Sequence, residues 1–95
     1  MQDNGREGVS EGDKDLVAVV FAERFEKELR KLRDAGLKQK IMKQIEKIVA
    51  EPDIGKPMRY QRQGTREVYV SPLQLSYAYE HDTLYFLDIY HKNEQ

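Results

Sequence analysis

Residues 16–52 read LVAVVFAERFEKELRKLRDAGLKQKIMKQIEKIVAEP, and this stretch decides the fold. Its first part, Leu16–Phe21, is a continuous apolar run rich in β-branched residues, which predicts a strand buried on both faces. Apolar residues then recur at spacings of four, four and three, which is typical of an amphipathic helix that stops at Gly36. The apolar residues of this stripe are Phe21, Phe25, Leu29 and Leu32.

The same periodicity continues beyond Gly36 and predicts a second helix of roughly fourteen residues. Its apolar positions are Leu37, Ile41, Ile45, Ile48 and Val49. The helix should end before Pro52, because a proline disfavours helical conformation in the residue that precedes it. A short connection at Gly36 implies that the two helices form an antiparallel hairpin.

Beyond this stretch the pattern changes to alternation with a period of two. A loop at 51–57 leads to two strands, Met58–Arg62 and Arg66–Val70, joined by a three-residue hairpin at 63–65. Alternating residues at 73–79 and a largely apolar run at 84–90 predict two more strands, the last of them central. The predicted order β-α-α-β-β-β-β describes an α+β fold, an antiparallel meander with both helices on one face.

Composition limits the chain further. Its 95 residues allow one domain, expected at 16–95, and the polar, glycine-containing residues 1–15 are expected to form a disordered leader. No apolar run reaches the roughly 20 residues of a membrane span, so we expect a soluble, cytoplasmic protein without a membrane partner. Without cysteine and with only two histidines, the sequence favours neither a disulfide framework, a metal site nor a cofactor.

Charge is distributed unevenly, although the net charge is only -1. Residues 24–66 hold thirteen basic and six acidic side chains, whereas both ends of the chain are acidic. Most of these basic residues suit the solvated faces of helices. The basic residues outside the predicted helices are therefore the ones that indicate a binding or catalytic role.

Several short motifs, in this order, resemble the RelE/ParE toxins of bacterial and archaeal toxin-antitoxin pairs. They are the opening strand leading into FEKELRKLRDAG, the loop with Gly55-Lys56-Pro57, GTREVYV, LSYAY and the terminal LYFLDIYHKNEQ. The ending is similar to that of HigB-like members. The resemblance covers residues 16–95 and implies a microbial-RNase-like fold, a neutralising antitoxin and cleavage of messenger RNA on the ribosome. Inhibition of DNA gyrase is the ParE-type alternative.

RNA cleavage through the 2′-hydroxyl needs a base, a cation for the phosphate and an acid for the leaving oxygen. The predicted catalytic residues, which we expect around one phosphate, are Lys56, Arg66, His91 and Lys92. The predicted RNA-binding residues are Arg59, Tyr60, Arg62 and Gln74. Histidine is the side chain whose ordinary pKa lies nearest neutrality, so His91 is expected to be the natural proton carrier. A simpler interpretation of Arg62 and Arg66 is that they protect a hairpin edge from aggregation.

Two positions depart from the pattern of the family. Gln74 stands where many relatives have an arginine for the scissile phosphate, and the chain ends at Gln95 without the C-terminal tyrosine of RelE-type members. Each lost phosphate contact costs about 1.5 to 3 kcal/mol, which slows a reaction roughly 10- to 200-fold. The sequence therefore predicts weakened cleavage, or alternatively a noncatalytic gyrase inhibitor or an inactive antitoxin-binding homologue.

Overall fold

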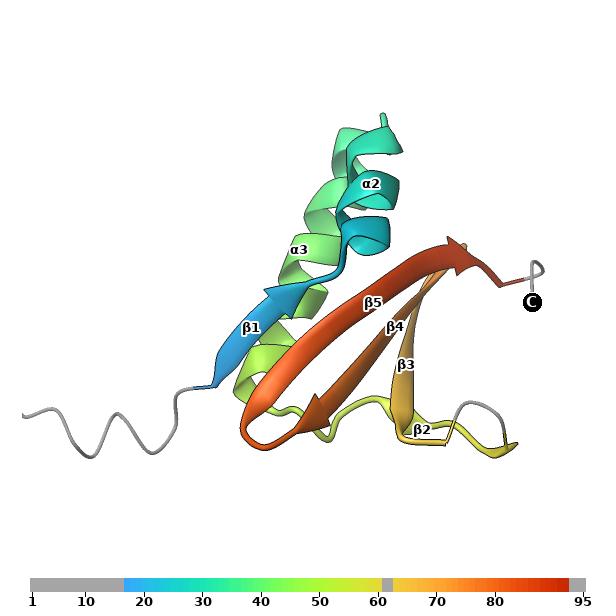
Figure 1. Cartoon of the computed structure of the whole chain (residues 1–95). Helices are drawn as coiled ribbons and strands as arrows, with labels where there is room; N and C mark the ends of the chain where they lie inside the picture. The colour runs from blue at the N-terminus through green and yellow to red at the C-terminus, as the bar shows by residue number, and fades with distance from the viewer. Residues whose placement is uncertain (1–16, 61–62, 93–95) are drawn as a thin grey trace, which may run out of the picture.

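The computed structural model describes residues 17–60 and 63–92 (Figure 1). Two helices and five strands follow one another in this part of the chain. They are β1 (Ala18–Phe21), α2 (Glu23–Lys31), α3 (Ala35–Ala50), β2 (Lys56–Pro57), β3 (Thr65–Val70), β4 (Leu73–Glu80) and β5 (Thr83–His91). The order is the predicted β-α-α-β-β-β-β, so the α+β prediction is confirmed. The expected leader at 1–15 lies outside the described residues, and the domain boundary at residue 16 stays a prediction.

The five strands form one sheet in the order β1-β5-β4-β3-β2. β5 pairs in parallel with β1 and antiparallel with β4, so the last strand is an interior strand, as predicted. The remaining neighbours, β4 with β3 and β3 with β2, are antiparallel. The chain therefore leaves β1, passes through both helices and returns to fill the sheet from the opposite edge.

Both helices pack against one face of the sheet and run in opposite directions (Figure 1). The core between them is made of fully or nearly fully buried side chains from both layers. The helices contribute Phe25, Ile41, Ile45 and Ile48, and the strands contribute Val70, Leu73, Leu75, Tyr77, Leu84, Phe86 and Ile89. Burial of this apolar surface is the main stabilising contribution in a domain of this size.

The boundary between the helices lies earlier than Gly36. α2 ends at Lys31 with Leu32 as its C-cap, and Asp34 caps the start of α3 by accepting a hydrogen bond from the Leu37 backbone N–H at 3.0 Å. A side-chain oxygen at this position satisfies one of the free N–H groups of the first turn. The prediction that Gly36 stops the first helix is therefore wrong, because Gly36 lies within the first turn of α3. The predicted end of the second helix before Pro52 is confirmed.

β1 forms where the apolar run predicts it, but it is not buried on both faces. It lies at the edge of the sheet, and all four of its residues are exposed. Its C-terminal end is held by Phe21, whose ring stacks on Phe86 at 5.3 Å between centroids. The error arises because an apolar run reports the preference for β structure, whereas burial depends on what lies beside the strand.

The prediction of a strand at Met58–Arg62 is wrong for residues 58–60, and its last two residues lie outside the described part of the chain. The strand before β3 is the two-residue β2, which lies in the segment predicted as a loop, and Lys56 and Pro57 pair with Glu67 and Arg66. Tyr60 instead adopts a positive φ of 59°. The hairpin is thus wider than three residues, because pairing begins nearer to the end of α3.

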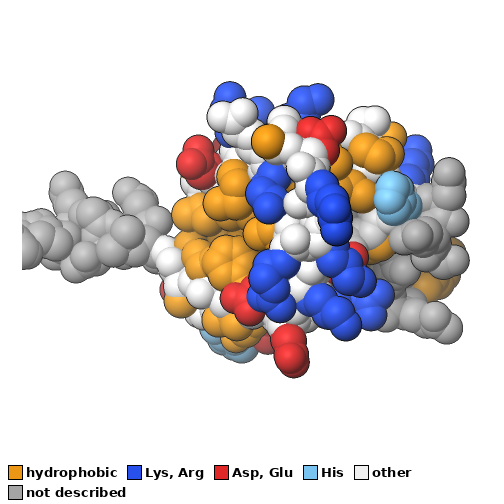
Figure 2. All heavy atoms as spheres, turned by 90° about the horizontal axis from the view of Figure 1, so that it is seen from above, with side chains coloured by type: hydrophobic (Ala, Val, Ile, Leu, Met, Phe, Trp, Pro, Cys, Tyr) orange, Lys and Arg blue, Asp and Glu red, His pale blue; other side chains and the backbone are white. Residues whose placement is uncertain are grey.

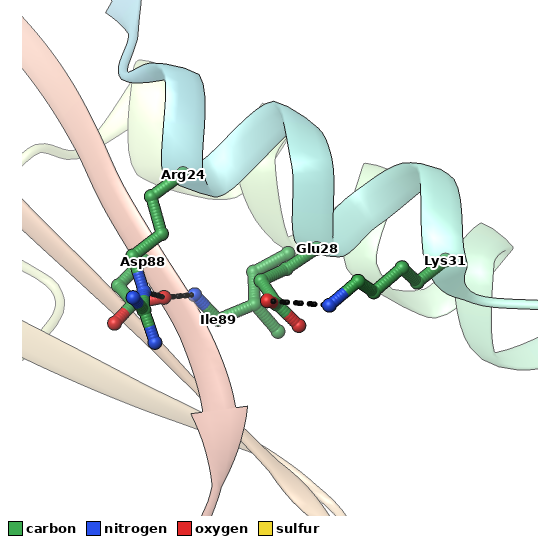
Figure 3. A network of polar contacts seen from close by, with 5 residues as sticks. All are labelled: Arg24, Glu28, Lys31, Asp88 and Ile89. Atoms are coloured by element: carbon green, nitrogen blue, oxygen red, sulfur yellow. Dashed lines mark hydrogen bonds and ion pairs between the residues drawn. The ribbon is translucent and has the colours of Figure 1, made fainter.

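A polar contact fixes α2 to the second half of β5, where β1 no longer pairs with it (Figure 3). Arg24 Nε donates to Asp88 Oδ1 at 3.0 Å, and the same oxygen accepts the Ile89 backbone N–H at 2.8 Å. A register shift in β5 opposite Ser76 and Tyr77 precedes this point. Within the described residues, neither helix is long and apolar enough to span a membrane.

Candidate functional site

The strand register separates the polar side chains of the sheet into two sets. Residues directly opposite one another on paired strands point to the same face, and successive residues alternate. Val68, Leu75 and Ile89 are register partners and face the helices, so we call their side the helical face. The opposite side, which neither helix covers, is the open face (Figure 1). Every candidate residue on β3, β4 and β5 belongs to one of the two.

Arg66 lies on the helical face, where it is the register partner of buried Tyr77. Its guanidinium donates to the backbone oxygens of Gly55 and Asp53 at 2.7 and 3.0 Å, and it lies 3.5 Å from the Asp53 carboxylate. Backbone oxygens and one carboxylate thus surround this cation. Its geometry holds the loop between α3 and β2.

Tyr77 holds the same loop from beneath. Its hydroxyl donates to the Pro52 backbone oxygen at 2.7 Å and accepts the Gly55 N–H at 2.9 Å. Burial raises the pKa of Tyr77, against the lowering effects of the Gly55 N–H and the Arg66 charge. A Cβ at Gly55 would lie 2.7 Å from the Tyr77 hydroxyl, so only glycine allows this close approach. The loop before Lys56 is therefore fixed by side chains of the sheet.

On the open face, a buried acid meets a tyrosine. Glu67 is only 6% exposed, and its carboxylate accepts a hydrogen bond from the hydroxyl of Tyr90. These residues belong to β3 and β5, so the contact spans the intervening strand β4. A buried carboxylate needs such a polar partner, because its desolvation is otherwise costly. Lys56 on β2 is the register partner of Glu67, so its side chain belongs to the same face as the pair.

A second row on the open face lies two residues further along the strands. It consists of three register partners, Tyr69, Gln74 and Tyr90. Tyr69 is 51% exposed, and the ammonium of Lys92 lies 5.0 Å from the centre of its ring. The row and the adjoining Lys92 therefore combine an accessible aromatic ring, an amide and a cation.

Residues 19–95 match the family model of the ParE toxin of type II toxin-antitoxin systems, parDE. This match covers most of the chain. The chain belongs to the ParE toxin family. A search of curated protein sequences finds no match.

Solved structures agree with the ParE-family fold. The toxin-antitoxin complex RelBE2 from Mycobacterium tuberculosis matches with a TM-score of 0.68 and 24% identity, over 83% of this chain and 94% of that chain. The YoeB/ParE toxin from Agrobacterium tumefaciens matches with a TM-score of 0.71 and 14% identity, over 78% of this chain and 96% of that chain. The intact E. coli RelBE toxin-antitoxin complex matches with a TM-score of 0.68 and 19% identity, over 83% of this chain and 99% of that chain. At these identities the similarity establishes the fold, and the RelE-like prediction is confirmed.

The four predicted catalytic residues of this ParE-family chain are not brought together around one point. Arg66 and His91 are partners of core residues on the helical face, whereas Lys56 and Lys92 belong with the open face. His91 and Lys92 are adjacent in sequence, and successive side chains along a strand point to opposite sides of the sheet. The expectation of a single cluster is therefore corrected, and the catalytic role of each residue stays a prediction.

The predicted RNA-binding residues are spread over two regions. Arg59 and the 87% exposed Tyr60 follow β2, and Arg59 lines an open hollow of about 570 Å³ together with Lys56, Pro57 and Met58. Gln74 lies in the open-face row, and Arg62 lies outside the described residues. Within the described part of the chain, no group of three or more metal-binding side chains occurs.

Sequence reasoning missed Glu67, Tyr69 and Tyr90 as members of one surface. A signal was available, because alternation along TREVYV separates Glu67 and Tyr69 from the apolar Val68 and Val70. A charged residue in mid-strand, opposite the apolar side, indicates a polar face. The contact with Tyr90 depends on register across three strands, which the sequence does not reveal.

A third surface combines positive charge with exposed apolar side chains. Figure 2 views the molecule from above, and Lys and Arg side chains gather in the middle of this view beside a hydrophobic patch. α2 contributes exposed basic residues, and β1 contributes exposed apolar residues. They are Arg24, Lys27, Arg30 and Lys31 on α2, and Val19, Val20 and Phe21 on β1.

Proposed function

We propose that this toxin of a type II toxin-antitoxin pair is a ribosome-dependent endonuclease of messenger RNA, and that RNA meets the open face of the sheet. The observation that carries the proposal is the hydrogen bond between Tyr90 and the buried Glu67, with Lys56 as the register partner of Glu67. The hydrogen bond joins a hydroxyl to a proton acceptor, and a cationic residue is the register partner of that acceptor. All three belong to a face that no described helix covers.

The chemistry that this arrangement supports is transesterification through the 2′-hydroxyl. The 2′-hydroxyl proton passes to the Tyr90 oxygen as the Tyr90 proton passes to Glu67, so the carboxylate is the final base. The 2′-oxygen forms a bond to phosphorus and the bond to the 5′-oxygen breaks, which leaves a 2′,3′-cyclic phosphate. Lys56 stabilises the charge on the phosphate and donates the proton that the leaving 5′-oxygen needs.

The test is cleavage of a defined messenger RNA on purified ribosomes. Tyr90→Phe and Glu67→Gln should each slow cleavage about 100-fold or more, since general-base catalysis typically contributes 10²- to 10⁴-fold. His81→Ala, in the exposed turn before β5, is the matched control and should cleave like the parent. Thermal midpoints of all variants separate lost chemistry from lost folding. Undiminished cleavage by both open-face variants would refute the assignment.

Inhibition of DNA gyrase is the second candidate, and one observation favours it. Arg66 is the only arginine in β3, β4 and β5, and it is engaged with Gly55 and Asp53 on the helical face. Gln74 adds no charge to the open face. A noncatalytic toxin needs no arginine on the open face to bind the scissile phosphate. Translation and DNA supercoiling should therefore be assayed side by side, with loss of supercoiling alone supporting the second candidate.

The proposed partner is a cognate antitoxin, because the similar M. tuberculosis and E. coli structures are toxin-antitoxin complexes. We expect an acidic amphipathic segment of the antitoxin to cover the basic residues of α2 and the exposed apolar residues of β1. Opposite charges accelerate such an encounter, so association should slow as salt rises. Stopped-flow mixing at low and high salt measures this, and equal rates would contradict an electrostatic role.

A further inference from the structure

We propose that Tyr69, Gln74 and Lys92 form a subsite that binds one nucleotide of single-stranded RNA, with the base stacked on the Tyr69 ring. This inference rests on the proposed function, because it assumes that RNA reaches the open face. It adds a binding element that is separate from the Glu67–Tyr90 pair. None of these three residues carries out a step of the proposed cleavage.

The ring of Tyr69 is suited to stacking. It is half exposed, it lies on the open face, and its hydroxyl donates to Ser71 Oγ at 3.3 Å. A strand backbone and this hydroxyl contact limit the movement of the ring, so little freedom is lost when a base binds. Aromatic side chains on open sheet faces bind unstacked RNA bases in this way.

Lys92 provides the charge that a nucleotide needs. Its ammonium lies 5.0 Å from the Tyr69 ring centre, and its backbone N–H donates to the Pro72 oxygen at 3.3 Å. A cation on an exposed ring is held more weakly than a stacked base. An incoming base can therefore displace the ammonium, whose flexible stem lets it pair with the adjoining phosphate. The contact between Lys92 and Tyr69 thus identifies both the ring that stacks on the base and the cation that pairs with the phosphate.

Gln74 completes the row between two tyrosines. Its register partners are Tyr69 on one side and Tyr90 on the other. An amide presents a donor and an acceptor together and can read the polar edge of a base. Where an arginine would bind phosphate regardless of base, Gln74 instead makes the subsite selective. Tyr90, held by Glu67, borders the amide on its far side.

The experiment measures binding separately from cleavage. A fluorescein-labelled, six-nucleotide 2′-O-methyl RNA cannot be cleaved through its 2′-oxygen, and its anisotropy reports binding to the full chain. Tyr69→Leu should weaken binding about 5- to 150-fold, whereas Tyr69→Phe keeps the ring and loses only the contact with Ser71, so it should weaken binding less. Lys92→Gln should reduce the salt dependence of binding by roughly one released ion. Gln74→Ala should narrow the differences in affinity among oligomers of different base composition.

Two results would overturn the subsite: no RNA binding by the parent, and equal RNA binding by Tyr69→Leu and the parent. If Tyr69→Leu in the second case also binds the antitoxin more weakly, this row is a protein-binding surface. The proposed endonuclease is judged separately by ribosome-dependent cleavage with the parent and Tyr90→Phe. Its failure and the failure of the subsite are therefore distinguishable.

Discussion

Arg66 and Glu67 are neighbours on β3, yet they serve different parts of the molecule. Arg66 turns to the helical face, where Gly55 and Asp53 surround its guanidinium. Glu67 turns to the open face, where its carboxylate accepts the Tyr90 hydroxyl. The helical face thus uses its polar groups to fix the chain, whereas the open face gathers the groups that we propose act on RNA. Adjacent charges in a strand are therefore poor evidence for one site.

The largest effect should come from truncating the helical face. Phe86→Ala should reduce the free energy of unfolding by about 3–5 kcal/mol, because Phe86 is fully buried and contacts the rings of Phe21, Phe25 and Tyr77. Urea denaturation measures the loss. The open-face control Tyr69→Ala should stay within about 0.5 kcal/mol of the parent. Similar losses for both variants would remove the distinction between the faces.

A smaller effect is expected where the helical face holds the loop. Gly55→Ala should lower the free energy of unfolding by about 1–3 kcal/mol, since the new methyl group would lie 2.7 Å from the Tyr77 hydroxyl. Gly64→Ala is an informative comparison, because a Cβ there meets nothing within 4 Å and only its φ of 98° opposes the change. A Gly55→Ala variant as stable as the parent would show that Tyr77 does not hold the loop closely.

Alkaline pH should weaken the same region. The folded state raises the pKa of Tyr77 above its ordinary value of 10.0, so the unfolded chain loses this proton first as pH rises. Stability is therefore complete below about pH 10 and declines above it. Urea midpoints at about pH 8 and about pH 10.5 measure the decline. Tyr77→Phe should show less of it, with the remainder from Tyr79, whose pKa is also raised.

An identical alkaline decline in the parent and Tyr77→Phe would assign the effect to other groups. Tyr79→Phe is the matched control for this experiment. Burial raises the pKa of Tyr79, followed by the Asp82 carboxylate and, least, by the Asp53 carboxylate of the 52–55 loop, while the Tyr79 hydroxyl donates its hydrogen bond to Asp82 in its own turn. The two variants therefore separate the effect of a hydroxyl that is hydrogen-bonded to the loop from that of one that is not.

The smallest effect should be found at the surface contact between α2 and β5. Arg24→Ala should cost about 0.2–1 kcal/mol, because Arg24 is largely exposed and its contact with Asp88 is screened by salt. The cost is measured as the difference in unfolding free energy between the parent and Arg24→Ala, at low and at high salt. Lys27→Ala provides a nearby exposed control on the same helix. A loss above about 2 kcal/mol would show that α2 depends on this contact far more than its exposure indicates.

The sequence predicts the elements that depend on local periodicity and misses those that depend on distant contacts. The stripe through Ile41, Ile45 and Ile48 identifies α3, and alternation identifies β4 and β5. β2 is missed because the loop before it is held by Tyr77, 22 residues beyond Gly55. Neither residue carries a local signal of this contact. The predicted helix stop at Gly36 fails for a different reason, because the Asp34 cap that begins α3 is a local contact with Leu37.

The candidate site follows the same rule. The sequence identifies Gln74, Lys56 and Lys92 as polar residues near the predicted strands, and the structure places them on the open face or beside it. Alternation places Arg66 on the side of the apolar Val68 and Val70, so its face is readable from the sequence of β3. The face of His91 is not, since it depends on the pairing of β4 with β5 and on the register shift in β5.

The most direct test of the account compares the two faces in one reaction. Messenger RNA cleavage on ribosomes should be mapped by the new 5′ ends formed with the parent, Tyr90→Phe and Arg66→Lys. The account predicts that Tyr90→Phe loses these ends while it stays folded, and that Arg66→Lys keeps them wherever its loop remains folded. Ends that persist in Tyr90→Phe and vanish in a folded Arg66→Lys would place the chemistry on the helical face and contradict the account.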